Sequence, residues 1–270
     1  MIMDQEFLRS LEARARKRHA RIGIGILNAD AQLITSLQPA TEYADLLLVG
    51  GEPCCDCALE QIATEEPWKE LVRLLAEGEI DGAVRGNLPA GRTMRALADR
   101  FNVRVRRLAL LELSGWAFLF GPVGIDEGDT VSDRLGLVLD GSNFLKQLGV
   151  MPKASILSGG RMEDLGRSER VDRSLAEGEL IASLAREAGV EARHRGILIE
   201  SCRGDDLLVA PEGISGNLIF RTLLLLCGVR SLGAPVIMED VFVDSSRARG
   251  DFNGPVMLAS AMVGTKEKKV

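Results

Sequence analysis

The sequence predicts an α/β protein, and two features of the chain support this prediction. Short apolar runs that end at glycine recur along the chain, and amphipathic helical patterns separate them. Near-continuous apolar strands that alternate with amphipathic helices are typical of a mostly parallel sheet with both faces covered. The chain has 270 residues, of which 46% are hydrophobic, so it is long enough for one large domain or two smaller ones.

Several apolar runs are expected to form strands, and helical patterns lie between them. In chain order the expected strands are Arg21–Leu27, Tyr43–Gly50, Ile80–Gly86, Gly115–Gly124, Lys153–Gly160, Gly196–Ser201, Asp206–Pro211 and Gly233–Met238. The helical patterns cover residues 1–21, 67–79, 90–101, 132–149 and 176–189. Gly149 and Gly189 end two of these patterns, where glycine is favoured because the backbone often turns left-handed.

Composition excludes several classes of function. The formal net charge is −6, so no strongly basic domain is present to neutralise the phosphates of a nucleic acid. No apolar run approaches the roughly 20 residues of a transmembrane helix, and the N-terminal stretch lacks the apolar core of a signal peptide. Five cysteines, an odd number, fit a reducing compartment better than a disulfide framework. We therefore expect a cytoplasmic protein that binds neither nucleic acid nor membrane.

No metal site is expected from the cysteines and histidines. Cys54, Cys55 and Cys57 share the segment PCCDC, but no fourth ligand stands nearby at metal-binding spacing. This pattern favours a loop of small, partly buried thiols. His19 and His194 lie in basic, polar sequence and are expected to be solvated rather than catalytic.

Polar residues and glycines follow several of the expected strands. In open α/β sheets, ligands bind beyond the carboxyl ends of the strands, where glycine allows close approach and helix N-termini offer N–H groups. The candidate ligand-binding residues there are Arg85, Gly86, Asn87, Ser158, Gly159, Arg161, Ser215, Gly216 and Asn217. Each glycine turn taken alone is more simply a strand-to-helix connection. Arginines at several strand ends together favour recognition of phosphate or carboxylate.

No nucleotide-binding fingerprint accompanies these turns. Neither a Walker P-loop nor a strict G-x-G-x-x-G is present, so the sequence does not predict binding of a nucleoside triphosphate or a dinucleotide.

The segment Val243–Asn253, VDSSRARGDFN, crowds serines, arginines and aspartates behind an apolar run. Together with residues 207–237, it resembles the C-terminal signature of the phosphate acetyl/butyryltransferase family. In that family a strand, a proline, a Gly-Asn pair that opens a helix, and a D-x-S-R-G segment follow in this order. PKASILSGG (residues 152–160) and IDGAVRGN (80–87) also resemble segments of that family.

The resemblance covers most of the chain from about Leu46 onward and is strongest over Pro152–Gly254. Within the superfamily, RGNLPAG (85–91) and LSGGRMEDLGR (157–167) are most similar to the methanogenesis-marker branch, MtxX, which is sometimes labelled a methyltransferase subunit.

The resemblance implies two α/β lobes of the isocitrate-dehydrogenase-like type, with the site in a cleft between them. It implies a discontinuous first domain, residues 1–105 plus 238–270, and a second domain, residues 106–237. Members of the family transfer an acyl group between coenzyme A and phosphate. They use an arginine for phosphate, a serine near the acyl carbonyl and a carboxylate base. By position, Ser246 and Arg247 match the family's Ser-Arg pair, and Arg95 matches a second phosphate-binding arginine.

The chain departs from the family at the expected base. Asn253 falls at the position of the family's catalytic aspartate, and an amide cannot act as a general base. Asp251, two residues earlier, is the alternative base. Arg85 is a second departure, because the transferases usually have a small residue there, and an extra cation favours a more anionic ligand.

Two classes of function remain open. The first is an acyl-CoA:phosphate-type transferase, or a related transferase, with altered or reduced acyl-transfer chemistry. The second is a non-catalytic anion-binding or regulatory subunit, and the branch label adds a methyltransferase-associated role linked to methanogenesis. No tightly bound cofactor is expected; coenzyme A or a phosphorylated compound is the expected class of small anionic ligand. The resemblance also predicts a homodimer, the commonest soluble assembly.

Overall fold

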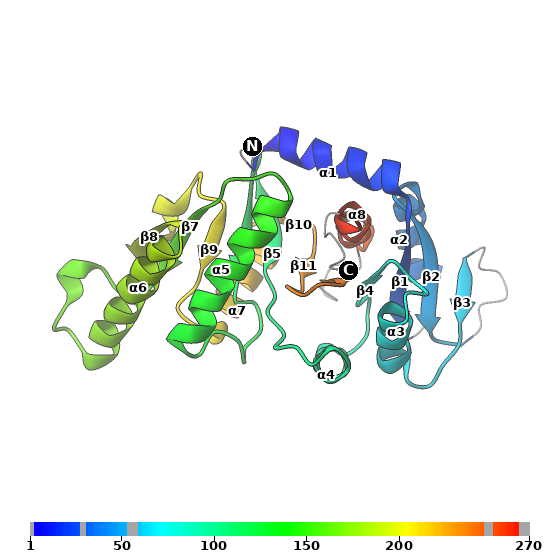
Figure 1. Ribbon diagram of the computed structural model, residues 1–270, viewed down its shortest axis with the longest axis horizontal. Coiled ribbons are helices and arrows are strands. Elements are labelled where there is room, and N and C mark those ends of the chain that lie inside the picture. Colours follow the sequence, from blue (N-terminus) through cyan, green and yellow to red (C-terminus); the bar gives the residue numbers. More distant parts are fainter. Residues whose placement is uncertain (1–2, 28–30, 53–58, 246–250, 265–270) are drawn as a thin grey trace. The chain divides into compact units, whose positions relative to one another are not determined.

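The computed structural model describes residues 3–27, 31–52, 59–245 and 251–264 (Figure 1). Contacts divide the chain into two compact units: unit 1 is Met1–Leu8 with Arg106–Ser231, and unit 2 is Arg9–Val105 with Leu232–Val270. Helix α1 (Gln5–Arg18) contains the first of these boundaries. The predicted boundaries lie after residues 105 and 237, whereas the contacts divide the chain after Leu8, Val105 and Ser231.

In the described part of unit 2, six strands form one sheet in the order β11–β12–β4–β1–β2–β3. The strands are β1 (Ala20–Ile26), β2 (Ala44–Gly50), β3 (Glu60–Ile62), β4 (Gly82–Val84), β11 (Ala234–Pro235) and β12 (Val241–Asp244). Neighbouring strands are parallel except β11 and β12. The helical elements are α2 (Ala31–Leu37), η1 (Gln38–Glu42), α3 (Pro67–Ala76), α4 (Ala90–Phe101) and α8 (Asn253–Met262).

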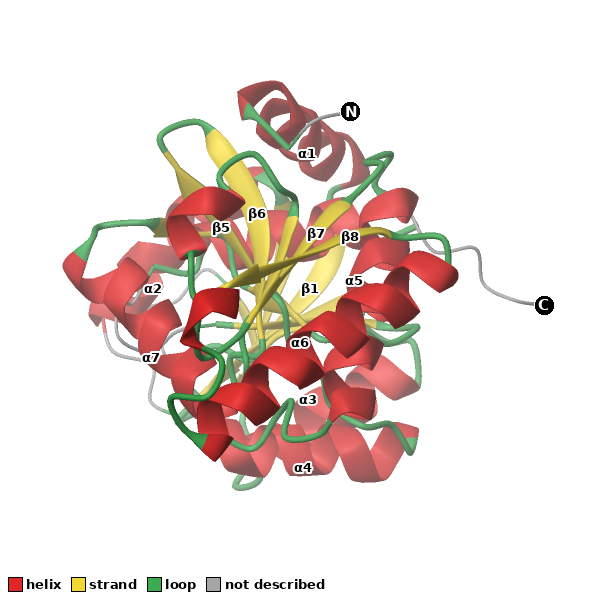
Figure 2. Cartoon of the chain, turned by 90° about the vertical axis from the view of Figure 1, so that its left-hand side faces the viewer, coloured by secondary structure: helices red, strands yellow, loops and turns green. Residues whose placement is uncertain are grey.

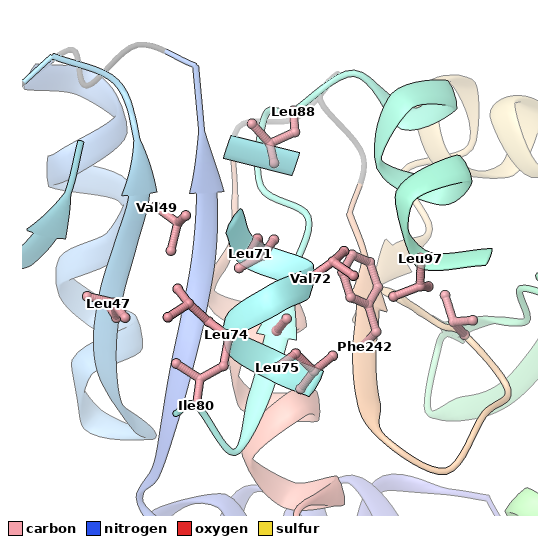
Figure 3. Close-up of a cluster of buried hydrophobic side chains, with 12 residues drawn as sticks. Leu47, Val49, Leu71, Val72, Leu74, Leu75, Ile80, Leu88, Leu97 and Phe242 are labelled. Carbon is pink, nitrogen blue, oxygen red and sulfur yellow. The ribbon is translucent and has the colours of Figure 1, made fainter. Parts of the chain in front are cut away.

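Strand β1 shows why this sheet packs closely. Its sequence alternates isoleucine with glycine, and a Cβ at Gly23 would lie 2.6 Å from the Cδ1 atom of Ile80. A Cβ at Gly25 would lie 2.2 Å from the Cδ1 atom of Leu88. The glycine face of β1 therefore leaves room for a buried apolar cluster, in which Figure 3 shows Leu71 and Leu74 near the strands.

In the described part of unit 1, six strands form a mixed sheet in the order β10–β5–β6–β9–β7–β8. The strands are β5 (Ala109–Leu113), β6 (Trp116–Gly121), β7 (Lys153–Leu157), β8 (Glu191–Gly196), β9 (Leu207–Val209) and β10 (Arg230–Ser231). Strands β6, β9, β7 and β8 run parallel, while β5 is antiparallel to both β6 and β10. The prediction of an α/β fold with mostly parallel sheets is confirmed.

The helices of unit 1 begin and end at residues with recognisable capping roles. They are α5 (Val131–Gln147), η2 (Met162–Asp164), α6 (Glu169–Glu187), η3 (Ile199–Cys202), α7 (Gly213–Arg221) and a π-helical turn (Thr222–Leu226). Thr130 and Asp133 form a capping box at the start of α5. Gly149 and Gly189, just beyond α5 and α6, have φ values of +83° and +79°. Figure 2 shows α5 and α6 packed over the strands of this sheet.

Two of the expected strands were placed wrongly. The predicted strand Gly196–Ser201 is instead β8, which ends at Gly196, and residues 199–202 form the turn η3. Strand β8 lies at the sheet edge and carries charged, exposed residues. Its sequence therefore lacks the apolar run by which the other strands are predicted. The predicted strand Gly233–Met238 shrinks to the two residues of β11, and the strand that leads into the C-terminal polar segment is β12.

Candidate functional site

In unit 2 the parallel strands β1, β4 and β12 end at the same edge of the sheet. Val84 of β4 pairs with Ile24 of β1 on one side and with Val243 of β12 on the other. The residues that follow Val84 therefore lie between the ends of its two neighbours. This arrangement brings Arg85, Gly86 and Asn87 next to Asp244 and Ser245.

Arg85 ties the ends of β4 and β12 together. Its side chain is only 5% exposed, and its Nε atom donates to the Asp244 carboxylate. The Nη atoms donate to the backbone carbonyls of Leu88 and Ser245. Each guanidinium nitrogen thus has an internal acceptor, so Arg85 holds the loop in place rather than presenting a free cation.

Gly86 and Asn87 join the end of β4 to the end of β1. Gly86 has a φ of +63°, and a Cβ there would lie 1.9 Å from the Gly25 carbonyl oxygen, so only glycine fits. The side-chain oxygen of Asn87 accepts from the Leu27 N–H at 2.7 Å. The backbone N–H of Asn87 donates to the Gly25 carbonyl at 3.2 Å. Among the described residues, the Nδ2 group of this half-buried side chain has no hydrogen-bond partner.

Helix α4 starts three residues after Asn87 without a side-chain cap. Its N-cap residue is Pro89, which has no side-chain acceptor, so N–H groups of the first turn stay available. Arg95 is exposed on this helix and forms no ion pair within the described ranges. Arg92 instead lies over the Trp68 ring, 4.7 Å from the ring centre. The start of α4 therefore offers free donors near Asn87.

The predicted catalytic segment follows Ser245 directly. Ser246 and Arg247 lie outside the described residues, as do Cys54, Cys55 and Cys57. Ser245 is buried, and its hydroxyl donates to the Gly86 carbonyl at 2.9 Å, so the start of the segment is anchored to the β4 loop.

The alternative base Asp251 and the position expected to hold the base, Asn253, lie at the start of α8. The N-cap residue Phe252 makes no side-chain cap bond. Asp251, the exposed residue before it, instead accepts from the Asn253 N–H at 3.0 Å and so satisfies a backbone donor of the first turn. The side-chain oxygen of Asn253 is buried without a hydrogen-bond partner among the described residues. In this arrangement the Asp251 carboxylate already has a structural partner.

In unit 1, Ser158, Gly159 and Arg161 follow β7, but the sequence interpretation missed their neighbour His194. Ser158 is buried, and its hydroxyl lies 2.8 Å from the Nε2 atom of His194, whose side chain is only 5% exposed. Burial lowers the pKa of His194, and nearby Glu179 only partly opposes this shift.

The expectation of a solvated His194 is wrong; its alternation with buried Ala192 in β8 was the available signal. Arg161 is exposed and forms no ion pair within the described ranges, but its charge contributes to the lowered pKa of Asp164.

The third group of predicted residues, Ser215, Gly216 and Asn217, is engaged in internal contacts. The Glu212 carboxylate accepts from the N–H groups of Ile214 at 2.6 Å and Ser215 at 2.9 Å, so it caps α7. The Asn217 amide donates to the Val123 carbonyl at 2.6 Å. A Cβ at Gly216 would lie 2.2 Å from the Pro122 carbonyl oxygen. These residues dock α7 on the loop after β6.

The described ranges show neither a metal site nor a membrane helix. No group of three or more His, Cys, Asp or Glu side chains gathers there in a way that could hold a metal ion. None of the helices in these ranges combines the length and the hydropathy needed to cross a bilayer.

Relatives with similar sequences cover nearly the whole chain. No family model matches it. A "Putative methyltransferase mtx subunit X" of Methanosarcina mazei is 44% identical over 97% of this chain and 98% of that protein. An "Uncharacterized methyltransferase" of Methanopyrus kandleri is 38% identical over 85% of this chain and 92% of that protein.

Solved structures with the same fold are far more distant in sequence. A phosphotransacetylase from Staphylococcus aureus matches with a TM-score of 0.66 at 16% identity, over 96% of this chain and 98% of that one. A branched-chain phosphotransacylase from Enterococcus faecalis matches with a TM-score of 0.69 at 15% identity, over 88% and 98%. A 4-hydroxythreonine-4-phosphate dehydrogenase from Klebsiella pneumoniae matches with a TM-score of 0.63 at 11% identity, over 92% of this chain and 99% of that one.

At these identities the structures establish the fold, while the relatives establish the family, and both agree with the resemblance in the sequence. The chain belongs to the family of the mtx subunit X proteins, and it folds as a phosphotransacetylase does.

Proposed function

We propose that the chain is a phosphotransacetylase-like transferase that binds an anionic ligand of the phosphate or coenzyme A class. The observation that supports this most is the edge of unit 2 where Asn87 precedes the uncapped start of α4. Free backbone N–H groups at a helix start, with the positive end of the helix dipole, favour an oxyanion. The free amide group of Asn87 and the exposed Arg95 add donors of the right kind.

The predicted Ser246–Arg247 pair extends this site by resemblance. It follows directly on Ser245, which the Arg85 and Gly86 contacts hold in place. In the proposal Arg247 binds phosphate and Ser246 lies near the acyl carbonyl. Gly86 and Arg85 shape the loop, and Ser158, Gly159 and Arg161 form a second anion-contacting loop in unit 1.

Calorimetric titration with inorganic phosphate and with coenzyme A tests ligand binding. Charge-assisted hydrogen bonds contribute roughly 1.5–3 kcal/mol, so Asn87→Ala, Arg95→Ala and Arg247→Ala should each weaken phosphate binding about tenfold. Arg100→Ala, at the far end of the same helix as Arg95, is the matched control and should bind as the unaltered protein does. Unchanged affinity in all three variants would remove this edge from the ligand site.

The proposed acyl-transfer chemistry is weak, because the position expected to hold the base carries Asn253. Loss of a general base typically lowers a rate by 10²–10⁴-fold. We expect slow conversion of acetyl phosphate and coenzyme A, which Asn253→Asp raises. If Asp251 is the base instead, Asp251→Asn abolishes the native rate. Fast native turnover that neither substitution changes would contradict both Asp251 as the base and position 253 as the site of the lost base.

A second candidate function is a binding or regulatory subunit of a methyltransferase. The name of the Methanosarcina mazei relative supports it, since it describes a methyltransferase subunit. The internal engagement of Asp251 supports it as well, because a carboxylate that caps α8 is less available as a base. Anion binding without any acetyl-transfer activity would favour this candidate.

On the basis of the resemblance to the transferases, we also propose that the chain forms a homodimer. Light scattering of the purified protein measures its mass in solution, and a strictly monomeric mass would overturn this part of the proposal.

A further inference from the structure

In unit 1 a buried serine is hydrogen-bonded to a histidine, and an exposed glutamate lies beside the same ring as an ion-pair partner. The Ser158 hydroxyl lies 2.8 Å from His194 Nε2, and His194 Nδ1 lies 3.4 Å from a carboxylate oxygen of Glu179. The three residues come from the end of β7, from β8 and from α6. Gly178 of α6 makes the arrangement fit, because a Cβ there would lie only 2.7 Å from His194 Nε2.

The charged neighbours of His194 determine which of its nitrogens carries the hydrogen. An ionised carboxylate only accepts, so Glu179 requires an N–H at Nδ1. The neutral ring then has a lone pair at Nε2, which accepts from the Ser158 hydroxyl. Glu179 itself is held by Arg186 at 3.0 Å. The adjacent arginines on β8, Arg193 and Arg195, are paired with Glu191 and Asp205.

Backbone hydrogen bonds tie Ser158 to the loop that carries the exposed Arg161. Ser158 N–H donates to the Gly196 carbonyl at 2.8 Å, and Ile197 N–H donates to the Gly160 carbonyl at 3.0 Å. The Gly159 N–H donates to the Ser174 hydroxyl at 2.8 Å. These bonds fix the backbone of the loop. The side chain of Arg161 is exposed and forms no ion pair within the described residues, although its charge contributes to the lowered pKa of nearby Asp164.

Protonation of His194 would reverse the hydrogen bond to Ser158. With hydrogens on both ring nitrogens, Nε2 donates to the serine oxygen, and the serine hydrogen loses its acceptor. The nearest acceptor within the described ranges is the Gly160 carbonyl at 3.5 Å, which is at the limit of a hydrogen bond. The freed hydrogen and the new positive charge both favour an anion.

We propose that Ser158, His194 and Arg161 form a proton-linked anion subsite, in which uptake of a proton by His194 frees the Ser158 hydroxyl for an oxyanion held by Arg161. This inference rests on the proposed function, the binding of an anionic ligand, and adds that pH regulates the binding. Because burial lowers the pKa of His194, the ring is neutral near pH 7 and the subsite strengthens as the solution becomes acidic. By linkage, a bound anion must raise the pKa of His194 in return.

Nuclear magnetic resonance can follow this ring, because the chain has only two histidines, His19 and His194. His19→Gln leaves a single imidazole signal. Sulfate is a suitable probe, since its charge does not change between about pH 5.5 and 7.5. We expect the Nδ1-protonated tautomer without sulfate, and a rise in the pKa of His194 when sulfate is added. We also expect sulfate to bind several-fold more tightly at the lower pH, approaching tenfold for a rise of one pKa unit.

Variants separate this inference from the proposed function. Arg161→Ala should remove the effect of sulfate on the pKa of His194, and His194→Gln should make the sulfate affinity of this subsite independent of pH. Arg203→Ala, an exposed arginine of the same unit, and Asn87→Ala, in unit 2, should leave the coupling intact. Sulfate binding that is independent of pH, with an unchanged pKa of His194, would overturn the proton linkage alone. No sulfate binding at either pH would overturn both the linkage and this loop as an anion site.

Discussion

Helices α4 and α7 both begin behind the end of a parallel strand, and anion binding was predicted at both. They differ in the residue at the N-cap. At α7 this residue is Glu212, whose carboxylate accepts from the N–H groups of Ile214 and Ser215. At α4 it is Pro89, which supplies no acceptor. The Glu212 carboxylate thus occupies the N–H groups at the start of α7, while those at the start of α4 remain available. A strand–turn–helix pattern therefore indicates a ligand site only when the helix start is uncapped.

The largest expected effect comes from Arg85, which we interpret as an internal tie beside α4. Arg85→Ala removes the buried ion pair with Asp244, and breaking a buried pair typically costs about 3–5 kcal/mol of unfolding free energy. Urea denaturation measures this loss. Arg100→Ala, an exposed arginine on α4, should change the stability by less than about 0.5 kcal/mol. A stable Arg85→Ala protein that has lost phosphate binding would instead make Arg85 a ligand-binding residue.

Glu212→Ala tests the comparison most directly, because it converts the start of α7 to an uncapped state. Loss of a cap should lower the unfolding free energy by about 0.5–2 kcal/mol. The freed N–H groups should also create new sulfate binding in unit 1, measurable by calorimetry. Glu187→Ala, an exposed glutamate at the end of α6, is the control and should do neither. A loss of stability without new sulfate binding would show that a free helix start alone is not enough.

The pH dependence of this cap has a definite sign. Burial opposes ionisation of Glu212, but hydrogen bonds from Ser215 and Ile214 outweigh it and lower the pKa of its carboxyl group. A carboxyl with a lowered folded pKa stabilises the fold above its unfolded value, about 4.3, and this contribution is lost as the pH falls through the folded value. The acid stability of the Glu212→Ala protein should therefore depend less on pH in that window.

The smallest expected effect separates capping from chemistry at α8. Asp251→Ala removes the acceptor for the Asn253 N–H and should cost about 1 kcal/mol, whereas Asp251→Asn retains a capping oxygen and should be nearly neutral. Thermal unfolding of the two variants measures the difference. Equal stability of both variants would show that Asp251 is not needed as a cap, which would strengthen its candidacy as a base.

Much of the fold was accessible from local sequence because strong apolar strands dominate it. The expected strands over residues 21–27 and 43–50 coincide closely with β1 and β2, whose residues are nearly all buried. The two misplaced strands are short or one-sided. Strand β12 has four residues, and Pro235 in the neighbouring run lacks the N–H that a longer strand needs.

The candidate site was less accessible, because its contacts join distant parts of the chain. Arg85 reads as a free cation in sequence, and only its bond to Asp244, 159 residues away, shows that it is tied internally. His194 reads as solvated because its neighbours are charged, while its burial depends on the space left by Gly178. Glu212 is the exception, because its place just before the helix is a local signal in the sequence.

The discontinuity of unit 2 has a consequence for the order in which the protein is made. Strand β4 pairs with β1 early in the chain, but its other neighbour, β12, is synthesised only after all of residues 106–231. Until β12 arrives, Arg85 has no Asp244 beside it, and one edge of β4 is unpaired. The continuous stretch of unit 1 can therefore fold on the ribosome while unit 2 still lacks β12, which lies between β11 and β4 in its sheet. The loops of unit 2 that we propose to bind the ligand thus take shape last, when the chain is nearly complete.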